Sequence, residues 1–307
     1  MEHTRQFRPL SELNLMDNFL FHEMLLQEDV REEFCRILLK TILNKEVRHV
    51  KVTPQKTILG ADINKHGIRL DAYIEAVVGS DSIDADVVPD IYDIEPNRTY
   101  ERETLPKRMR YYHGMIDSRF LQAGQTYDKL PNVVIIFILP YDPFGKDRMV
   151  YTIRNEVMEE PDIEYNDGAL KMILYTKGKT KDSGKELQDM LKYMEESTAD
   201  NVTNQDIESV HHLVNRVKAR KEVDLNYMKS WEWDDYNKKL GIQEGIELGR
   251  SEGLTEGIEK GIAKGIQSLI STCRKLNSTD EFILAELMSN FNLTQEEAQK
   301  YLERNSK

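Results

Sequence analysis

The segment that most constrains the fold is PNVVIIFILP, residues 131–140, in which seven consecutive apolar residues stand between two prolines. The run is far shorter than the roughly 18 residues needed to cross a bilayer. It is typical of a β-strand that is buried on both faces. Such a strand needs partner strands beside it and helices on both sides, so the sequence predicts a central sheet covered by helices.

The flanking segments supply the other elements of this sheet. Residues 11–44 place apolar residues at helical spacing in two stretches separated by an acidic break, and residues 104–122 do so in one. Residues 68–78 alternate with a period of two, which predicts a half-buried strand. A second strand is expected at 87–95, where it would complete a hairpin with 68–78. Further strands are expected at 149–155 and 170–176. This order predicts an α/β fold with a mixed central sheet flanked by helices.

The C-terminal part has a different composition. Residues 179–240 are rich in charge and predict a helical connector, and residues 269–307 predict short helices. Between them, residues 241–268 carry a glycine at every fourth position: Gly241, Gly245, Gly249, Gly253, Gly257, Gly261 and Gly265. A glycine inside a helix costs roughly 1 kcal/mol relative to alanine. The repeat therefore predicts either a helix that packs closely against a second copy, giving a homo-oligomer, or a low-complexity linker.

Composition narrows the class of protein. The 42 Lys+Arg stand against 54 Asp+Glu, a net charge of −12, which argues against a broadly basic nucleic-acid-binding surface but leaves room for a local basic strip. The chain has no apolar leader in its first fifteen residues and no candidate membrane span, so we expect a cytoplasmic protein without a membrane partner. Its two cysteines exclude a disulfide framework.

Carboxylates gather where the two strands of the predicted hairpin face each other. Asp71 lies on the polar face of the first strand, and Asp93, Glu95 and Asn97 share one face of the second. Pairing of the strands would bring Asp71 and Glu95 together, and two such carboxylates repel unless a cation lies between them. A hard ion such as Mg²⁺ suits oxygen ligands and phosphodiester hydrolysis. The alternative is that these acids are only solvated.

The order and spacing of several motifs resemble the Rpn-type recombination-promoting nucleases, a family also described as transposases, within the PD-(D/E)xK nuclease superfamily. The resemblance covers roughly residues 10–178. The motifs that carry it are the following: Met16-Asp17-Asn18-Phe19-Leu20-Phe21, Ile68-Arg69-Leu70-Asp71, Tyr92-Asp93-Ile94-Glu95-Pro96-Asn97, Arg108-Met109-Arg110-Tyr111-Tyr112, Leu121-Gln122-Ala123-Gly124-Gln125-Thr126-Tyr127 and the stretch 131–154. It implies a restriction-endonuclease-like fold for this part, with an α-helical C-terminal extension.

The resemblance also implies roles for single residues. Asp71 matches the first metal-binding aspartate, and Glu95 matches the acid of the (D/E)xK element, so both would bind Mg²⁺ or Mn²⁺. Asn97 stands where the superfamily places lysine, and asparagine can donate a hydrogen bond but carries no charge. A basic residue of the following helix, Lys107 or Arg110, would then assist at the phosphate. Asp17 is either a third metal ligand or a helix cap.

A basic strip follows the acids. Between Arg98 and Arg119 there are six basic and three acidic residues, a local charge of +3. The residues expected to contact DNA phosphates are Arg98, Arg102, Lys107, Arg108 and Arg110. The other interpretation is a solvated helix face with ion pairs along the helix.

These observations together predict a metal-dependent DNA endonuclease that promotes recombination or transposition of mobile DNA. The alternative is a degenerate nuclease fold that binds DNA or oligomerises without catalysis. Close approach of Asp71 and Glu95 at one end of the sheet, with basic groups near them, is the geometry that the enzyme requires.

Overall fold

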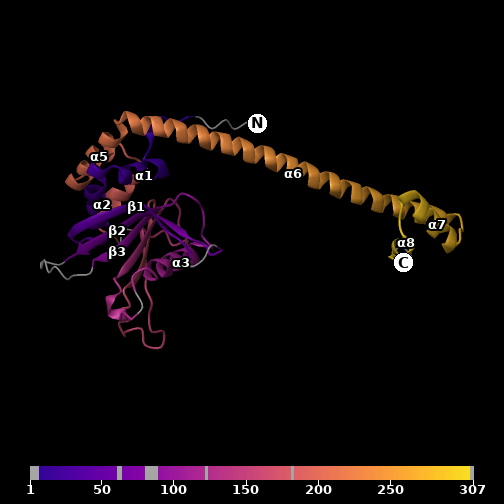
Figure 1. The fold of residues 1–307 in the computed structure, drawn as a ribbon, viewed down its shortest axis with the longest axis horizontal. Helices are drawn as coiled ribbons and strands as arrows, with labels where there is room; N and C mark the ends of the chain where they lie inside the picture. Colours follow the sequence, from indigo (N-terminus) through magenta and orange to yellow (C-terminus); the bar gives the residue numbers. More distant parts are fainter. Residues whose placement is uncertain (1–6, 61–63, 80–88, 122–123, 181–182, 305–307) are drawn as a thin grey trace. The chain divides into compact units, whose positions relative to one another are not determined.

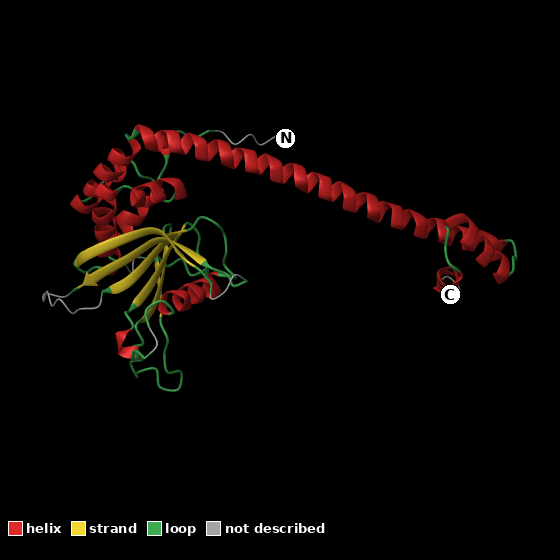
Figure 2. Ribbon diagram, viewed as in Figure 1, coloured by secondary structure: helices red, strands yellow, loops and turns green. Residues whose placement is uncertain are grey.

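The computed structural model of the chain describes residues 7–60, 64–79, 89–121, 124–180 and 183–304. The chain divides into two compact units, Met1–Ser230 and Trp231–Lys307. The first contains a six-stranded mixed sheet flanked by helices, as the sequence predicts, and the second is entirely helical (Figures 1 and 2).

The sheet has the strand order β1-β2-β3-β4-β6-β5. Its strands are β1 (Val47–Ile58), β2 (Ile68–Val78), β3 (Asp90–Pro96), β4 (Val133–Leu139), β5 (Val150–Ile153) and β6 (Ala169–Tyr175). β2 and β3 pair antiparallel, which confirms the predicted hairpin, whereas β3–β4 and β4–β6 pair parallel. Every residue of β4 is buried, so the apolar run is the central strand that its sequence predicts.

Helices cover both faces of this sheet (Figure 2). One face packs against α1 (Asn18–Leu26), α2 (Glu28–Leu43), α4 (Lys185–Glu195) and α5 (Gln205–Lys218). The other face packs against α3 (Leu105–Asp117), through Leu105, Met109, Tyr112 and Ile116. α4 and α5 come from the 179–240 segment and contribute Leu191, Tyr193 and Val214 to the larger core.

The described structure differs from the sequence-based expectation at three places. The segment 11–44 forms two helices on either side of Gln27, whose backbone is extended, as the acidic break predicts, but its first residues form a short 3₁₀ turn, Leu10–Glu12, in place of a helix. The helix predicted to reach 122 ends at Asp117. The strand expected from 87 begins at Asp90; residues 87 and 88 lie outside the described part.

Strand β1 was not predicted at all. Its sequence, VRHVKVTPQKTI, has no regular alternation and contains Pro54, which suits an edge strand. Its register with β2 shifts between Arg48 and Lys51, and His49 and Gln55 have positive φ. These irregularities remove the period-two pattern on which recognition of a strand depends.

The glycine repeat lies inside α6 (Lys221–Lys275), a continuous helix of 55 residues. A Cβ added at each glycine from Gly241 to Gly261 would meet nothing within 4 Å, so these six glycines have no packing reason within the described chain. At Gly265 the Phe291 ring would lie 3.0 Å from such a Cβ. Within the described chain, Gly265 is therefore the one glycine of the repeat that another side chain approaches closely.

Two short helices follow, α7 (Asp280–Phe291) and α8 (Gln295–Arg304), which confirms the prediction for this part. Thr294 and Glu297 form a reciprocal cap at the start of α8: the Thr294 amide donates to Glu297 Oε2 at 2.9 Å, and the Glu297 amide donates to Thr294 Oγ1 at 3.3 Å. Ile266, Ile270, Ile283 and Leu287 form a small separate core. Among the described residues, no helix combines the length and apolarity needed to span a membrane.

Candidate active site

The structure brings Asp71 and Glu95 together on neighbouring strands. The backbone amide of Asp71 donates a hydrogen bond to Glu95 Oε1 at 2.7 Å. The register of β2 against β3 pairs Ala72 with Ile94, so the two acids stand at the next step of the ladder. The expected convergence of these two residues is therefore present.

Asp93 is a third acidic residue of this cluster and lies on β3, beneath helix α3. Its side chain is fully buried, and it shares with Glu95 the sheet face that α3 covers. Neither Asp93 carboxylate oxygen has a hydrogen-bond partner among the described residues. A buried carboxylate without a partner is costly, so Asp93 marks a place where the chain leaves bonding capacity for a proton or a cation.

Burial and mutual repulsion govern the protonation of the three acids. Burial, followed by the Asp71 charge, raises the pKa of Glu95 to about 8. Burial also raises the pKa of Asp93 well above its ordinary value, with added repulsion from Glu95 and Asp71, and burial raises the pKa of Asp71. Without a bound cation, the cluster therefore holds protons at neutral pH.

Arg108 supplies the positive charge that faces this cluster. Its guanidinium donates to Glu95 Oε2 at 3.2 Å, to Glu101 Oε2 at 2.9 Å and to the Tyr112 hydroxyl at 3.1 Å. It also lies 5.1 Å from the centre of the Phe137 ring. Arg108 was expected to contact DNA; in the described structure it holds Glu95 instead.

Asn97 follows β3 and is held by the backbone. Its backbone N–H donates to the Ile138 carbonyl at 2.9 Å, and its side-chain Oδ1 accepts from the Thr99 backbone N–H at 2.9 Å. Its Nδ2 group is buried and has no partner in the part of the chain that is described. A donor is thus available two residues after Glu95, at the position where the resemblance places a lysine.

The remaining basic candidates divide into two groups. Arg102, Lys107 and Arg110 are exposed and form no ion pair with a described residue. Arg98 instead pairs with Asp17, at 3.1 Å between Nη1 and Oδ1. Lys107 and Arg110 therefore have no acidic partner among the described residues, while Arg98 is held by Asp17 through one of its nitrogens.

Asp17 stands at the N-cap position of α1, but its side chain caps no amide of that helix. Its Oδ2 accepts from the Asn14 amide at 2.7 Å and contacts Arg8, and its Oδ1 contacts Arg98. Both oxygens are thus occupied by donors. The alternative of a helix cap is therefore wrong for Asp17.

The sequence did not single out Asp93 as a site residue or connect Arg108 with Glu95. The signal for Asp93 was an acid inside an otherwise apolar strand, Ile91-Tyr92-Asp93-Ile94, two residues before Glu95. Arg108 has no comparable signal, because a basic residue on a helix gives no indication of which neighbour it will reach in space.

The donor chemistry of the cluster suits a hard cation, because carboxylate oxygens are the preferred ligands of Mg²⁺. The side chains as placed do not form a finished metal site: within the described ranges, no group of three or more His, Cys, Asp or Glu is arranged to hold a metal ion. Both Glu95 oxygens already accept hydrogen bonds. Cation binding would require Glu95 Oε2 to release Arg108.

Fold and site define a mixed α/β protein with a buried carboxylate cluster at the junction of two strands and one helix. Comparison with family models, with curated proteins and with solved structures finds no match to this chain. The residues of the cluster therefore carry the functional argument alone.

Proposed function

We propose that the chain is a metal-dependent DNA endonuclease acting in recombination or transposition of mobile DNA, with a PD-(D/E)xK-like nuclease domain. The observation that carries the proposal is the convergence of Asp71 and Glu95, with the unpartnered carboxylate of Asp93 beside them. Asp71, Glu95 and Asp93 would hold Mg²⁺ or Mn²⁺. When bound, such an ion activates water and offsets charge on the phosphate.

The chain's own residues would orient the substrate. The side-chain amide of Asn97, which has no partner among the described residues, would donate a hydrogen bond to the substrate, and Lys107 and Arg110 are exposed cations on α3. Arg108, released from Glu95, would retain Glu101 as a partner at 2.9 Å. Its charge would then be available to a phosphate oxygen.

Plasmid nicking with Mg²⁺ or Mn²⁺ tests the proposal. The wild-type chain should convert supercoiled to nicked DNA, and Asp71→Ala should lose at least ~100-fold in rate, as expected for removal of an electrostatic partner of the reaction. Glu75→Gln, a change on the same strand away from the cluster, is the matched control. Equal nicking by wild type and Asp71→Ala would contradict the proposal.

A second candidate is a nuclease fold that binds DNA or oligomerises without catalysis. The observation that favours it is that both Glu95 oxygens already accept hydrogen bonds, from the Asp71 amide and from Arg108, and that Asn97 carries no charge. In that case metal would not bind, and isothermal titration with Mn²⁺ would give no heat above that of Asp71→Ala.

We further propose that α6 pairs with a second copy of the chain through the glycine repeat. Apolar side chains beside the glycines are exposed, among them Leu254 at 64 % and Ile258 at 55 %. At 100° per residue, Leu254 and Ile258 lie on one flank of Gly257, and Glu256 and Lys260 lie on the other.

The flanks indicate the orientation of the pair. An antiparallel crossing at Gly257 brings the same flank of each helix together. Leu254 then meets the partner's Ile258, and Glu256 meets the partner's Lys260. A parallel crossing would place Glu256 and Lys260 against the apolar flank. Rows of residues four apart favour a crossing near −50°. Within one chain, Glu256 and Lys260 already pair at 2.5 Å.

A further inference from the structure

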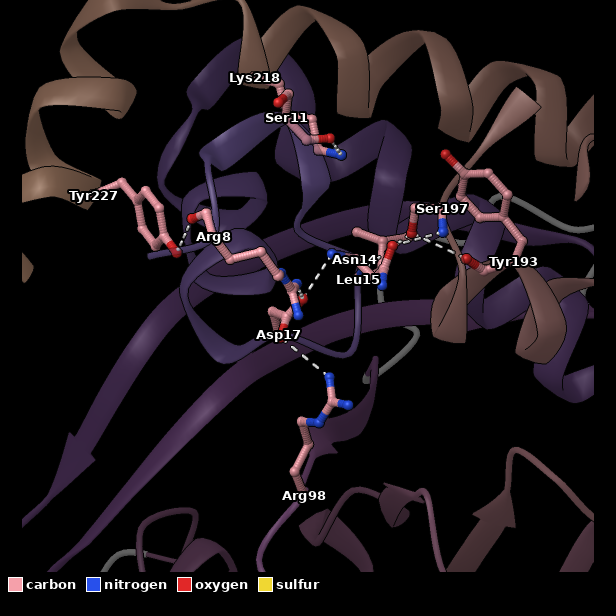
Figure 3. Close-up of polar contacts among 10 residues, drawn as sticks. All are labelled: Arg8, Ser11, Asn14, Leu15, Asp17, Arg98, Tyr193, Ser197, Lys218 and Tyr227. Atoms are coloured by element: carbon pink, nitrogen blue, oxygen red, sulfur yellow. Dashed lines mark hydrogen bonds and ion pairs between the residues drawn. The ribbon is translucent and has the colours of Figure 1, made fainter. Parts of the chain in front are cut away.

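Asp17 joins two arginines that are far apart in the sequence (Figure 3). Arg8 contacts Asp17 Oδ2, and Arg98 Nη1 lies 3.1 Å from Asp17 Oδ1. The Asn14 amide also donates to Oδ2, at 2.7 Å. The side chain of Asp17 is 19 % exposed, so the carboxylate lies mostly beneath the two guanidinium groups that it binds.

A third cation lies close to this group. Lys218, the last residue of α5, donates to the Ser11 carbonyl at 2.9 Å (Figure 3). Burial lowers the pKa of Lys218, the Asp17 charge opposes this effect and the Arg8 charge adds to it. Two arginines thus contact one carboxylate and a lysine is influenced by its charge. These four groups carry a formal charge of +2, in a chain whose net charge is −12.

The two arginines keep donors available to an anion. Their side chains are 40 % and 44 % exposed, and a guanidinium has five N–H donors, of which Asp17 uses one on each. Asp17 therefore fixes the two groups without using up their capacity to bind.

The backbone around this group is held in place. The Tyr227 hydroxyl donates to the Arg8 carbonyl at 2.7 Å (Figure 3), and the Met16 amide donates to the Met194 carbonyl at 3.1 Å. The Leu15 amide donates to Ser197 Oγ at 3.0 Å. Segments from both ends of the first unit thus fix the geometry before any ligand arrives, which lowers the entropy lost on binding.

Arg98 directly follows Asn97 and stands three residues after Glu95, so one of the two paired arginines lies next to the carboxylate cluster in the sequence. A phosphodiester backbone that reaches the cluster carries further phosphates on both sides of the cleaved bond. Arginine forks bind phosphate oxygens with two parallel hydrogen bonds. The fixed pair has the charge and the donor geometry for one such neighbouring phosphate.

We propose that Arg8 and Arg98 form a phosphate clamp for the DNA strand, and that Asp17 is the residue that positions it. This inference rests on the proposed action of the chain on DNA. It gives Asp17 a role different from a metal ligand or a helix cap: the carboxylate sets the spacing and orientation of two guanidinium groups.

Fluorescence anisotropy with a fluorescein-labelled 20-bp duplex (length chosen for the assay, about two helical turns) tests the clamp. The full chain is used with EDTA, so that binding is measured without cleavage, over a series of NaCl concentrations. Arg8→Gln and Arg98→Gln should each weaken binding by ~5- to 20-fold and reduce the slope of log K against log[salt] by about 1. Lys185→Gln, which removes an exposed charge from α4, should leave both quantities unchanged.

Asp17→Asn separates positioning from simple attraction. The substitution makes the local charge more positive, so attraction alone would tighten binding, whereas loss of the fixed geometry weakens it. Weaker binding is expected, and tighter binding would overturn the positioning role. A purely structural role would lower the melting temperature of Arg98→Gln without moving its affinity or salt slope, and that result would overturn the clamp.

The same measurements keep the two proposals apart. Asp71→Asn should abolish nicking and leave the duplex affinity within about 2-fold, because it removes no phosphate contact. Binding that depends on Arg98 in a chain that never nicks DNA would refute the nuclease and retain the clamp. Nicking by the wild-type chain, with a duplex affinity that neither Arg8→Gln nor Arg98→Gln changes, would retain the nuclease and refute the clamp. Absence of duplex binding by the wild-type chain would also refute the clamp.

Discussion

Glu95 receives the backbone amide of Asp71 on one oxygen, at 2.7 Å, and the guanidinium of Arg108 on the other, at 3.2 Å. The carboxyl group thereby joins two strands and one helix at a single point. It is 2 % exposed, so its protonation and its contacts are set by the fold rather than by solvent.

The stability of the metal-free protein should fall as the pH rises from about 4.5 to about 8. In this window the folded state keeps the Glu95 proton, because its pKa is raised to about 8, whereas the unfolded state, with a pKa of 4.5, has lost it. The unfolded state then binds fewer protons, and the free energy of unfolding decreases with pH.

Glu95→Gln removes this titration, so its melting temperature should depend less on pH over the same range. Thermal melts by circular dichroism in EDTA would measure both proteins. Equal pH dependence of wild type and Glu95→Gln would contradict the assignment of the raised pKa to Glu95.

Arg108→Gln should destabilise the metal-free protein by about 2–3 kcal/mol, because hydrogen bonds to charged groups contribute about 1.5–3 kcal/mol. The change removes the donors to Glu95 and Glu101 and exposes the cluster to its own repulsion. Arg110→Gln, an exposed position two residues away, is the matched control and should stay within about 0.5 kcal/mol of wild type. Urea denaturation measures both; similar losses would show that Arg108 is not a special contact.

Asp93→Asn should weaken Mn²⁺ binding while leaving the fold intact. The substitution keeps the size of the side chain and removes a repulsive neighbour of Glu95 and Asp71. Calorimetric titration should show at least ~10-fold weaker binding. Unchanged Mn²⁺ affinity would place Asp93 outside the metal site.

Charge reversal on α6 tests the antiparallel pair. Glu256→Lys and Lys260→Glu should each weaken self-association, since each creates a like-charge contact with the partner. The double variant should restore the association, because the charges are exchanged together. Sedimentation equilibrium measures the change. Single variants that behave as wild type would contradict the crossing at Gly257.

Gly257→Leu adds a second test of the same contact. A side chain there meets nothing within 4 Å in its own chain and raises the helix propensity, so the fold should be retained. Only close approach of a second helix would be blocked. A dimer that survives Gly257→Leu would show that the glycines do not form the contact.

Sequence patterns predicted those parts of the molecule whose signal is local. The apolar run became β4, and the alternation of residues 68–78 became β2. Asp71 and Glu95 were found because strand pairing converts spacing in the sequence into proximity. The irregular edge strand β1 escaped because its bulge and Pro54 remove the alternation.

The electrostatic partners were the part that spacing does not encode. Arg108 reaches Glu95 because α3 lies across β3, and Asp17 meets Arg98 across 81 residues of chain. Tyr73 lies on the same face of β2 as Asp71, yet it is 2 % exposed, since α3 covers that face. Contacts of this kind depend on the packing of whole elements, which a single sequence does not specify.

The irregularity of β1 also determines how the molecule can meet its neighbours. An outer strand with free amides and carbonyls invites another chain to extend the sheet. Pro54 has no backbone N–H to donate. His49 and Gln55 have positive φ, which interrupts the extended backbone, and Lys51 and Lys56 add charge. β1 thus resists addition of a further strand at this edge, which protects a protein with an apolar central strand from aggregation.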